Sequence, residues 1–279
     1  MKRRTGGAGP GWAAAVACLA VAAGCSAAPS SSSAGRSTTT TASADRTLTV
    51  LVTNDDGVGA PGINAVVQGL RALPHTTVTV VAPLANQSGT DGKTTPGHLV
   101  ATAATTASGY PATAVHGYPA DTITWAIDEH GISFRPDLVV SGINFGQNVG
   151  PLADLSGTVG AARAAVSRGI PALAASQGVD DGLSPDFSEG VKEVDGWIAL
   201  HRGALVDHDY GAVPPSGNLN IPTCPGGTVR GPVTAPLATS LTGITLSDVN
   251  CTSTTTSFRD DIEAFINGYA VIAPLGSGS

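Results

Sequence analysis

Hydrophobic and polar positions alternate between strand-like and helix-like segments along most of the chain. β-Rich runs occupy residues 47–53, 77–82, 112–116, 137–141, 170–176 and 269–275. Apolar residues at helical spacing predict helices over 62–73, 120–129, 156–168 and 187–201, with Pro74 ending the first and Gly169 the third. Because strands and helices alternate with short links, the pattern predicts an α/β fold with a mainly parallel sheet covered by helices on both faces. Residues 218–257 are rich in Pro, Thr and Gly and predict an irregular C-terminal extension.

The amino terminus has the pattern of an export signal. Lys2, Arg3 and Arg4 precede an apolar run over 12–23, which is too short to span a bilayer but suits the core of a signal peptide. Small residues before Cys25 resemble a bacterial lipobox, in which that cysteine is lipidated. Ala22 stands where lipoboxes usually have Leu, so plain secretion stays open. We expect an exported protein, either lipid-anchored to the outer face of the bacterial cytoplasmic membrane or secreted.

The segment after Cys25 predicts a tether rather than a fold. Eleven of the nineteen residues in 26–44 are Ser or Thr, and such a stretch buries too little apolar surface to offset the entropy of ordering it. We therefore divide the chain into a signal peptide (1–24), a flexible tether (25–45) and a folded domain (46–279). The lipid anchor is the only membrane attachment expected.

Two cysteines, Cys224 and Cys251, belong to the predicted folded domain. Export favours a disulfide between them, because exported proteins meet an oxidising environment. Two unpaired thiols are the alternative that the sequence leaves open. No pair of cysteines and histidines has the spacing of a zinc site.

Charge excludes one class of partner. The chain from Cys25 onward carries 11 basic and 21 acidic residues, a formal net charge of −10. Nucleic-acid polymers require a basic surface, so they are excluded as partners. An anion must instead be bound locally, by a metal ion, backbone N–H groups or a helix terminus.

A glycine-rich turn over 57–62 matches G-x-G-x-x-G after a strand and before a helix. A dinucleotide site also needs an acidic residue at the end of the second strand, where this chain has Ala82, Pro83 and Leu84. Asp55 and Asp56 directly before the glycines would also repel a pyrophosphate. The pattern therefore argues against a dinucleotide site.

Asp55 and Asp56 are adjacent carboxylates at the end of the first strand. Like charges at this separation destabilise each other unless a cation or solvent lies between them. A hard divalent cation such as Mg²⁺ takes carboxylate and amide oxygens as ligands. The alternative is an acidic turn with both side chains in water.

Other loops after strands add donors to this edge of the sheet, where ligands of parallel sheets bind. Ser88 follows the second strand and Asn144 the 137–141 strand. Ser156 is a plausible N-cap, and with Gly157 and Thr158 it opens a helix whose N–H groups and dipole suit an anion. A cation site beside an anion site predicts metal-assisted hydrolysis of a phosphate ester.

Several motifs resemble those of the SurE family of metal-dependent 5'- and 3'-nucleotidases. They are TNDDGVGAPGI (53–63), VAPLANQSG (81–89), GYPAD (117–121), PDLVVSGINFGQNVG (136–150), SGTVGAARAA (156–165), GIPALAAS (169–176) and GYAVIAPL (268–275). The resemblance implies a Rossmann-like three-layer sandwich, a requirement for Mg²⁺ or Mn²⁺, and hydrolysis of nucleoside monophosphates or other small phosphomonoesters.

Carried over motif by motif, the resemblance assigns the site residues. Asp55, Asp56, Ser88 and Asn144 match the metal ligands, and the two aspartates are also the catalytic candidates, as base, nucleophile or ligand only. Asn54, Gly89, Ser156, Gly157 and Thr158 form the predicted phosphate-binding set.

This chain also departs from the family. The residues before the serine, Leu84 to Gln87, replace a run that is usually charged, Asp-Arg-Asn-Arg, and keep only its Asn at Asn86. The segment after Pro222 lacks the usual aromatic stretch, so base recognition and assembly, including a homodimer, stay open. The alternative function is an exported, tethered metal- or nucleotide-binding protein without turnover.

Overall fold

The computed structural model describes residues 46–179, 187–214 and 216–275, all of which belong to one compact unit, Thr38–Ser279. The predicted signal peptide, the predicted tether and Cys25 lie outside the described residues. Within the described part, no helix has both the length and the apolar character that a membrane span requires.

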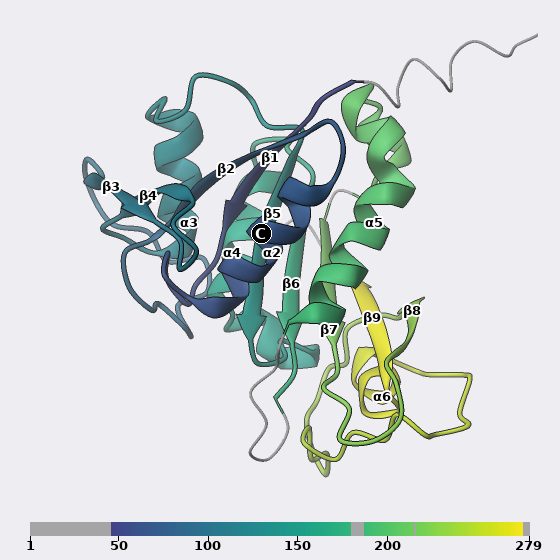
Figure 1. Cartoon of the computed structure of the whole chain (residues 1–279). Coiled ribbons are helices and arrows are strands. Elements are labelled where there is room, and N and C mark those ends of the chain that lie inside the picture. The colour runs from purple at the N-terminus through teal and green to yellow at the C-terminus, as the bar shows by residue number, and fades with distance from the viewer. Residues whose placement is uncertain (1–45, 180–186, 215, 276–279) are drawn as a thin grey trace, which may run out of the picture. The chain divides into compact units, whose positions relative to one another are not determined.

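One sheet organises the described residues (Figure 1). Its strands are β1 (Leu48–Thr53), β2 (Thr76–Pro83), β3 (Ala101–Thr105), β4 (Pro111–Val115), β5 (Leu138–Phe145), β6 (Ala172–Gln177), β7 (Ser216–Ile221), β8 (Arg230–Thr234) and β9 (Tyr269–Pro274). Among the described residues the order is β3-β4-β2-β1-β5-β6-β7-β9-β8, and only the β3–β4 and β7–β9 pairs are antiparallel. The central strands β2, β1, β5, β6 and β7 are mutually parallel, so their carboxyl ends lie along one edge.

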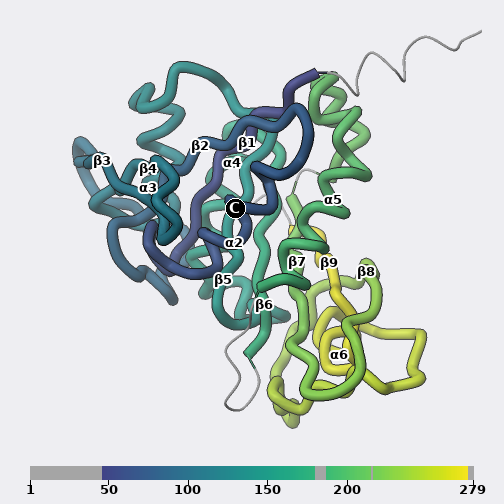
Figure 2. Tube along the Cα trace, viewed as in Figure 1, coloured from purple at the N-terminus to yellow at the C-terminus, as the bar shows by residue number. Residues whose placement is uncertain are grey.

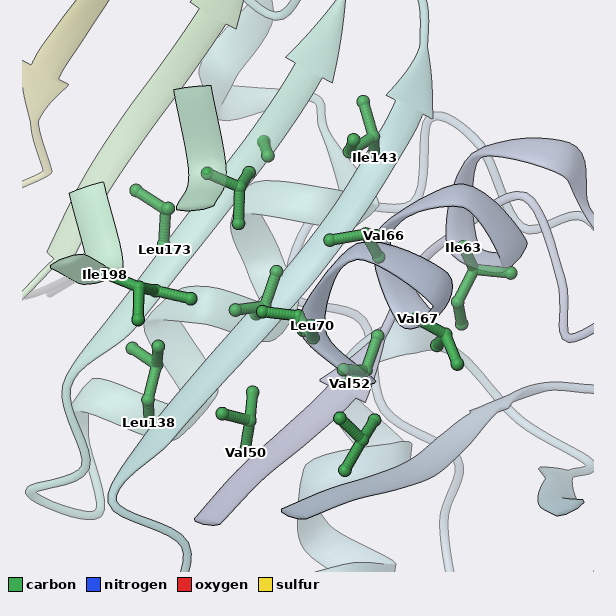
Figure 3. Close-up of a cluster of buried hydrophobic side chains, with 14 of the residues drawn as sticks. Val50, Val52, Ile63, Val66, Val67, Leu70, Leu138, Ile143, Leu173 and Ile198 are labelled. Carbon is green, nitrogen blue, oxygen red and sulfur yellow. The ribbon is translucent and has the colours of Figure 1, made fainter. Parts of the chain in front are cut away.

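Helices cover both faces of the central strands. The helices are α2 (Pro61–Ala72), α3 (Pro119–Ile123), α4 (Gly157–Val166), α5 (Ser188–Val206) and α6 (Asp261–Ile266), with a π-helical turn over Thr124–Asp128. On one face, α2 and α5 pack against side chains such as Val50 and Leu138 (Figure 3). On the other face, α3 and α4 pack against Leu51, which follows Val50 in the chain, and against Val139, which follows Leu138. Because β1 and β5 are buried on both faces in this way, their sequences are apolar at successive positions rather than at alternate ones.

At the β8 end of the sheet, α6 and the loops around it gather against β9 and form a small separate core (Figure 2, light green to yellow). This core contains Ile262, Phe265 and Val271 from α6 and β9. Buried Asp261 connects this core to the loop after β5, because its carboxylate accepts hydrogen bonds from the Gly150 and Ala238 N–H groups, both at 2.8 Å.

The predicted fold class is confirmed: the sheet is mainly parallel, and helices cover both of its faces. The N-cap and the helix end are also confirmed, since the Ser156 side chain accepts from the Val159 N–H and Gly169 follows α4 at a φ of 68°. The predicted helix over 120–129 is confirmed; it begins as a short α-helix and continues as a π-helical turn.

The prediction that 218–257 is irregular is wrong for two segments, β7 and β8. β7 was missed because its buried positions include Ser216, Asn218 and Asn220, which remove the hydrophobic signal of a central strand. The six-residue helix α6 is too short for helical spacing to appear in the sequence.

Cys224 and Cys251 are joined by a disulfide, with their Cα atoms 5.8 Å apart. Replacing both by Ser should lower the free energy of unfolding by about 3–4 kcal/mol, because the unfolded chain then regains the entropy of a loop of about 28 residues. Urea denaturation of the purified protein measures this. A reducing agent should lower the parent's midpoint to that of the variant, and equal midpoints for oxidised parent and variant would contradict the prediction.

Candidate active site

The predicted ligand loops meet at one edge of the sheet. β1 lies between β2 and β5 and is parallel to both, so the residues after β1 and β2 adjoin the end of β5. Asp55 and Asp56 follow β1, Ser88 follows β2, and Asn144 lies near the end of β5. The topology therefore brings together three segments that are far apart in sequence, carrying the Asp pair, Ser88 and Asn144.

Asp55 lies buried against the N-terminus of α4. The Thr158 hydroxyl donates to its Oδ1 at 2.7 Å. Gly157 permits this approach, because a Cβ there would lie 2.9 Å from the Asp55 Cβ. The pKa of Asp55 is raised to about 6, mainly by burial; the Thr158 hydroxyl opposes the rise and the charge of Asp56 adds to it. The carboxylate is thus costly to ionise, although the helix dipole and the hydroxyl favour its charged form.

Asp56 is held from two other loops. The Phe145 N–H donates to its Oδ2 at 3.0 Å, and the Asn86 side chain donates to its Oδ1 at 3.2 Å. Burial raises the pKa of Asp56, and these two hydrogen bonds oppose the rise. Asp56 therefore connects the turn after β1 to both neighbouring strands.

Asn86 also orders the loop that carries Ser88. Its side-chain oxygen accepts from the Ser88 N–H at 2.9 Å, while its nitrogen reaches Asp56. Ser88 itself is exposed. Farther along the loop, the Gln87 N–H donates to the Asp55 carbonyl at 2.7 Å. The loop after β2 is thus attached to both aspartates.

The side-chain amide of Asn144 uses its nitrogen in a hydrogen bond to Gly146, so its oxygen is the atom that could bind a cation. The side-chain nitrogen donates to the Gly146 carbonyl at 2.6 Å, leaving the oxygen on the other side of the amide. The pairing of β5 with β6 is irregular between Ser141 and Asn144. Gly142 lies at that irregularity with a φ of 131°, and a Cβ there would come 2.2 Å from the Ala175 carbonyl oxygen. Only glycine fits at this position, and the shift in register re-aims the side chains that follow it.

A clamp on Asn148 holds the loop that leaves Asn144. The Asn148 N–H donates to the Asn220 side chain at 2.7 Å, and its own amide nitrogen donates to Ser176 at 2.9 Å. Its carbonyl accepts from the Asn218 side chain at 2.7 Å. Asn218 and Asn220, whose polarity made β7 unrecognisable in the sequence, therefore hold this loop in place.

The predicted phosphate-binding residues fall into two groups. Asn54 is fully buried, and both polar atoms of its side chain bond the Gly57 backbone, so it closes the turn after β1. The Thr158 hydroxyl is bonded to Asp55, as described above. Ser156 and Gly157 are buried at the start of α4, where Ser156 caps the helix, and Gly89 lies in the exposed loop after Ser88.

The donors at this edge fit a hard divalent cation. They are two carboxylates, one amide oxygen and one hydroxyl, the oxygen ligands that Mg²⁺ and Mn²⁺ accept. In the described part of the chain, no three or more His, Cys, Asp or Glu side chains are placed to hold a metal ion. The predicted ligand set, with two carboxylates, one amide and one hydroxyl, is not a group of that kind and stays a prediction.

Asp260 and Asp261 are a second pair of adjacent aspartates, and their hydrogen bonds show that they have a structural role. Asp260 caps α6 by accepting from the Glu263 N–H, and Asp261 spends both oxygens on backbone N–H groups. Asp55 and Asp56 differ because they sit at the carboxyl end of a central strand among neutral oxygen donors. The alternative of an acidic turn with both side chains in water does not describe them, since Asp55 is 3% exposed.

Two contributors escaped the sequence analysis as site residues. Asn86 links Asp56 to Ser88, and the only signal for it is that it is the one residue retained from the family's charged run. The Phe145 N–H carries no sequence signal at all, because every residue except proline has one.

Comparisons with known proteins point to one family. A family model described as "Survival protein SurE" matches residues 50–242. "5'-Nucleotidase SurE" of Desulfovibrio desulfuricans is 35% identical over 187 residues, covering 64% of this chain and 72% of that protein. The protein of the same name from Methanopyrus kandleri is 41% identical over 154 residues, covering 55% of this chain and 57% of that protein. The crystal structure of SurE protein from Aquifex aeolicus superposes with a TM-score of 0.62 at 25% identity, covering 82% of this chain and 94% of that chain.

The raised pKa of Asp55 predicts a pH-dependent cost in the metal-free protein. The folded protein keeps this proton up to a pH of about 6, whereas the unfolded chain loses it near 3.8. The cost of ionisation is therefore fully present above pH 6, at about 3 kcal/mol, and disappears as the pH falls through 3.8. In EDTA at pH 7.5, Asp55→Asn should stabilise the protein by up to this amount.

Thermal or urea unfolding at pH 7.5 and pH 4.5 measures the difference between Asp55→Asn and the parent. The difference should shrink at the lower pH, because protonated Asp55 resembles Asn. Asp260→Asn serves as the matched control, since Asn also caps helices and should change little at either pH. Equal stability of parent and Asp55→Asn at pH 7.5 would contradict the assigned pKa.

Proposed function

The chain belongs to the SurE family, and from that membership and the geometry of its site we propose that it is a metal-dependent phosphomonoesterase acting on nucleoside 5'-monophosphates, and on 3'-monophosphates, releasing nucleoside and phosphate. The shared name of its relatives makes it a hydrolase of phosphoric monoesters of the 5'-nucleotidase type. The metal dependence and the 3' activity are the finer parts of the proposal.

One observation carries the proposal: Asp55 and Asp56 lie at the same sheet edge as the Asn144 amide oxygen, the Ser88 hydroxyl and the start of α4. This edge offers oxygen ligands for a cation and N–H groups for an anion side by side. A phosphate ester bound to a divalent cation needs both.

Mg²⁺ or Mn²⁺ bound by Asp55, Asp56, Ser88 and Asn144 would supply positive charge to the phosphate oxygens and polarise a water molecule. The chain's own residues do the remaining work. Asp55 is ionised at neutral pH because its pKa of about 6 lies below that pH, and Thr158 keeps the carboxylate oriented. The first-turn N–H groups of α4 favour the negative charge of the phosphate.

Export is proposed on the N-terminal sequence pattern, either by lipid anchoring at Cys25 or by secretion. The disulfide between Cys224 and Cys251 supports a location outside the reducing cytosol, where such bonds persist. Mass spectrometry of the mature protein, with or without a lipid at its first residue, distinguishes the two routes.

Phosphate release from AMP, GMP and 3'-AMP tests the proposed function, with Mn²⁺, with Mg²⁺ and with EDTA. We expect release that the chelator abolishes. Asp56→Asn should lower kcat/KM by at least a hundredfold, because it removes the negative charge of one of the two carboxylates proposed to bind the metal ion. Asp260→Asn, at the structural Asp pair, should retain the parent's rate.

Two outcomes would count against this assignment. Full activity in EDTA would remove the metal from the proposal, and near-normal activity of Asp56→Asn at saturating Mn²⁺ would remove this residue from the ligands. A folded protein that binds Mn²⁺ and AMP but releases no phosphate would be a binding protein.

A further inference from the structure

A cavity of about 480 Å³ opens beside Asp56, on the side away from α4. Its wall is the glycine-rich turn over 57–62 at the start of α2, together with Leu84, Asn86, Phe145 and Phe187. The volume is within the range of small-molecule sites, and none of the described residues that line it is basic. Of the predicted metal ligands, Asp56 lines this cavity, whereas Asp55, Ser88 and Asn144 are not among its described lining residues.

Exposed apolar side chains gather at this cavity. Leu84 and Phe145 are each 50% exposed, although most large hydrophobic residues of the described chain are buried. Apolar groups that converge on one cavity mark a binding surface, because water contact there is unfavourable until a ligand covers it.

Hydrogen bonds connect the residues of the cavity wall directly to Asp56. The Phe145 N–H that bonds Asp56 belongs to the same residue whose ring lines the cavity. Asn86, which bonds the other oxygen of Asp56, lines it as well. Phe187 is buried with its ring against Gly62, where a Cβ would come 3.1 Å from the ring. A group held in this cavity is therefore next to the carboxylate pair.

We propose that this cavity binds the flat, uncharged ring on the alcohol side of the phosphate ester, with Leu84, Phe145 and Phe187 as the residues that determine specificity. The inference rests on the proposed function. A nucleobase or a simple aryl ring fits such a wall, because ring faces stack on aromatic and aliphatic side chains. A second phosphate on the alcohol is disfavoured, because Asp56 is the only charged side chain among the described residues that line the cavity.

Matched substrate pairs isolate the ring. AMP and ribose 5-phosphate both carry their phosphate on the primary 5'-oxygen of ribose and differ by the base, and adenosine 3',5'-bisphosphate adds a second phosphate group to AMP. Benzyl phosphate and ethyl phosphate make the same comparison without a sugar. We expect kcat/KM to favour AMP over ribose 5-phosphate at least tenfold and to be lower for the bisphosphate. If the protein preferred AMP over ribose 5-phosphate but did not prefer benzyl phosphate over ethyl phosphate, the proposed preference for any flat ring would be overturned.

Phe145→Ala and Leu84→Asn test the wall, and each keeps the backbone N–H of its residue, which bonds Asp56 or the Val115 carbonyl. Each should lower the ratio of kcat/KM for AMP to that for ribose 5-phosphate about tenfold. Phe134→Ala and Leu200→Ala remove exposed hydrophobic side chains outside the cavity, 36% and 79% exposed, and should leave the ratio unchanged.

The outcomes separate this inference from the proposed function. Hydrolysis of all esters with no preference for the ring, or a ratio that neither variant changes, overturns the inference alone. No hydrolysis of any ester overturns the proposed function. Calorimetric titration with adenosine then still tests the cavity, since Phe145→Ala should weaken adenosine binding about tenfold and Phe134→Ala should not. Equal affinity of parent and Phe145→Ala for adenosine overturns the cavity assignment.

Discussion

The structure is governed by the cost of burying two adjacent carboxylates at the end of β1. None of the ion pairs formed by the described residues includes Asp55 or Asp56, so no basic side chain offsets their charge. Their neighbours are instead hydroxyl, amide and backbone N–H donors, which lower the cost without removing it. A buried pair of this kind leaves a local excess of negative charge that a divalent cation would neutralise.

The surrounding chain is shaped by the need to bring those donors within reach. Gly157 lets the start of α4 come against Asp55, and Gly142 lets β5 shift its register before Asn144. The Asn148 clamp then ties the end of β5 to β6 and β7. A rigid arrangement matters because oxygen donors must already be oriented if they are to favour a cation over water.

The loop after β2 and the end of β5 also determine the polarity of the site's rim beside Asp56. Leu84 follows β2 and Phe145 follows Asn144, so the rim beside Asp56 is apolar rather than basic. If Asp56 acts at the phosphate as proposed, these two side chains meet the alcohol part of the ester, and the specificity of this chain then depends on them.

The sequence by itself determined the fold class, the positions of most central elements and which strand-end loops would share one edge of the sheet. It could do so because alternating periodicities and strand-end motifs are local properties of the chain. It failed for β7, whose asparagines are polar for the sake of a contact with Asn148. Only the tertiary structure showed that Thr158 bonds Asp55, that Asn54 serves its own turn, and that a backbone N–H holds Asp56. Those contacts join residues up to 103 positions apart, and no local pattern records which of them the sheet will bring together.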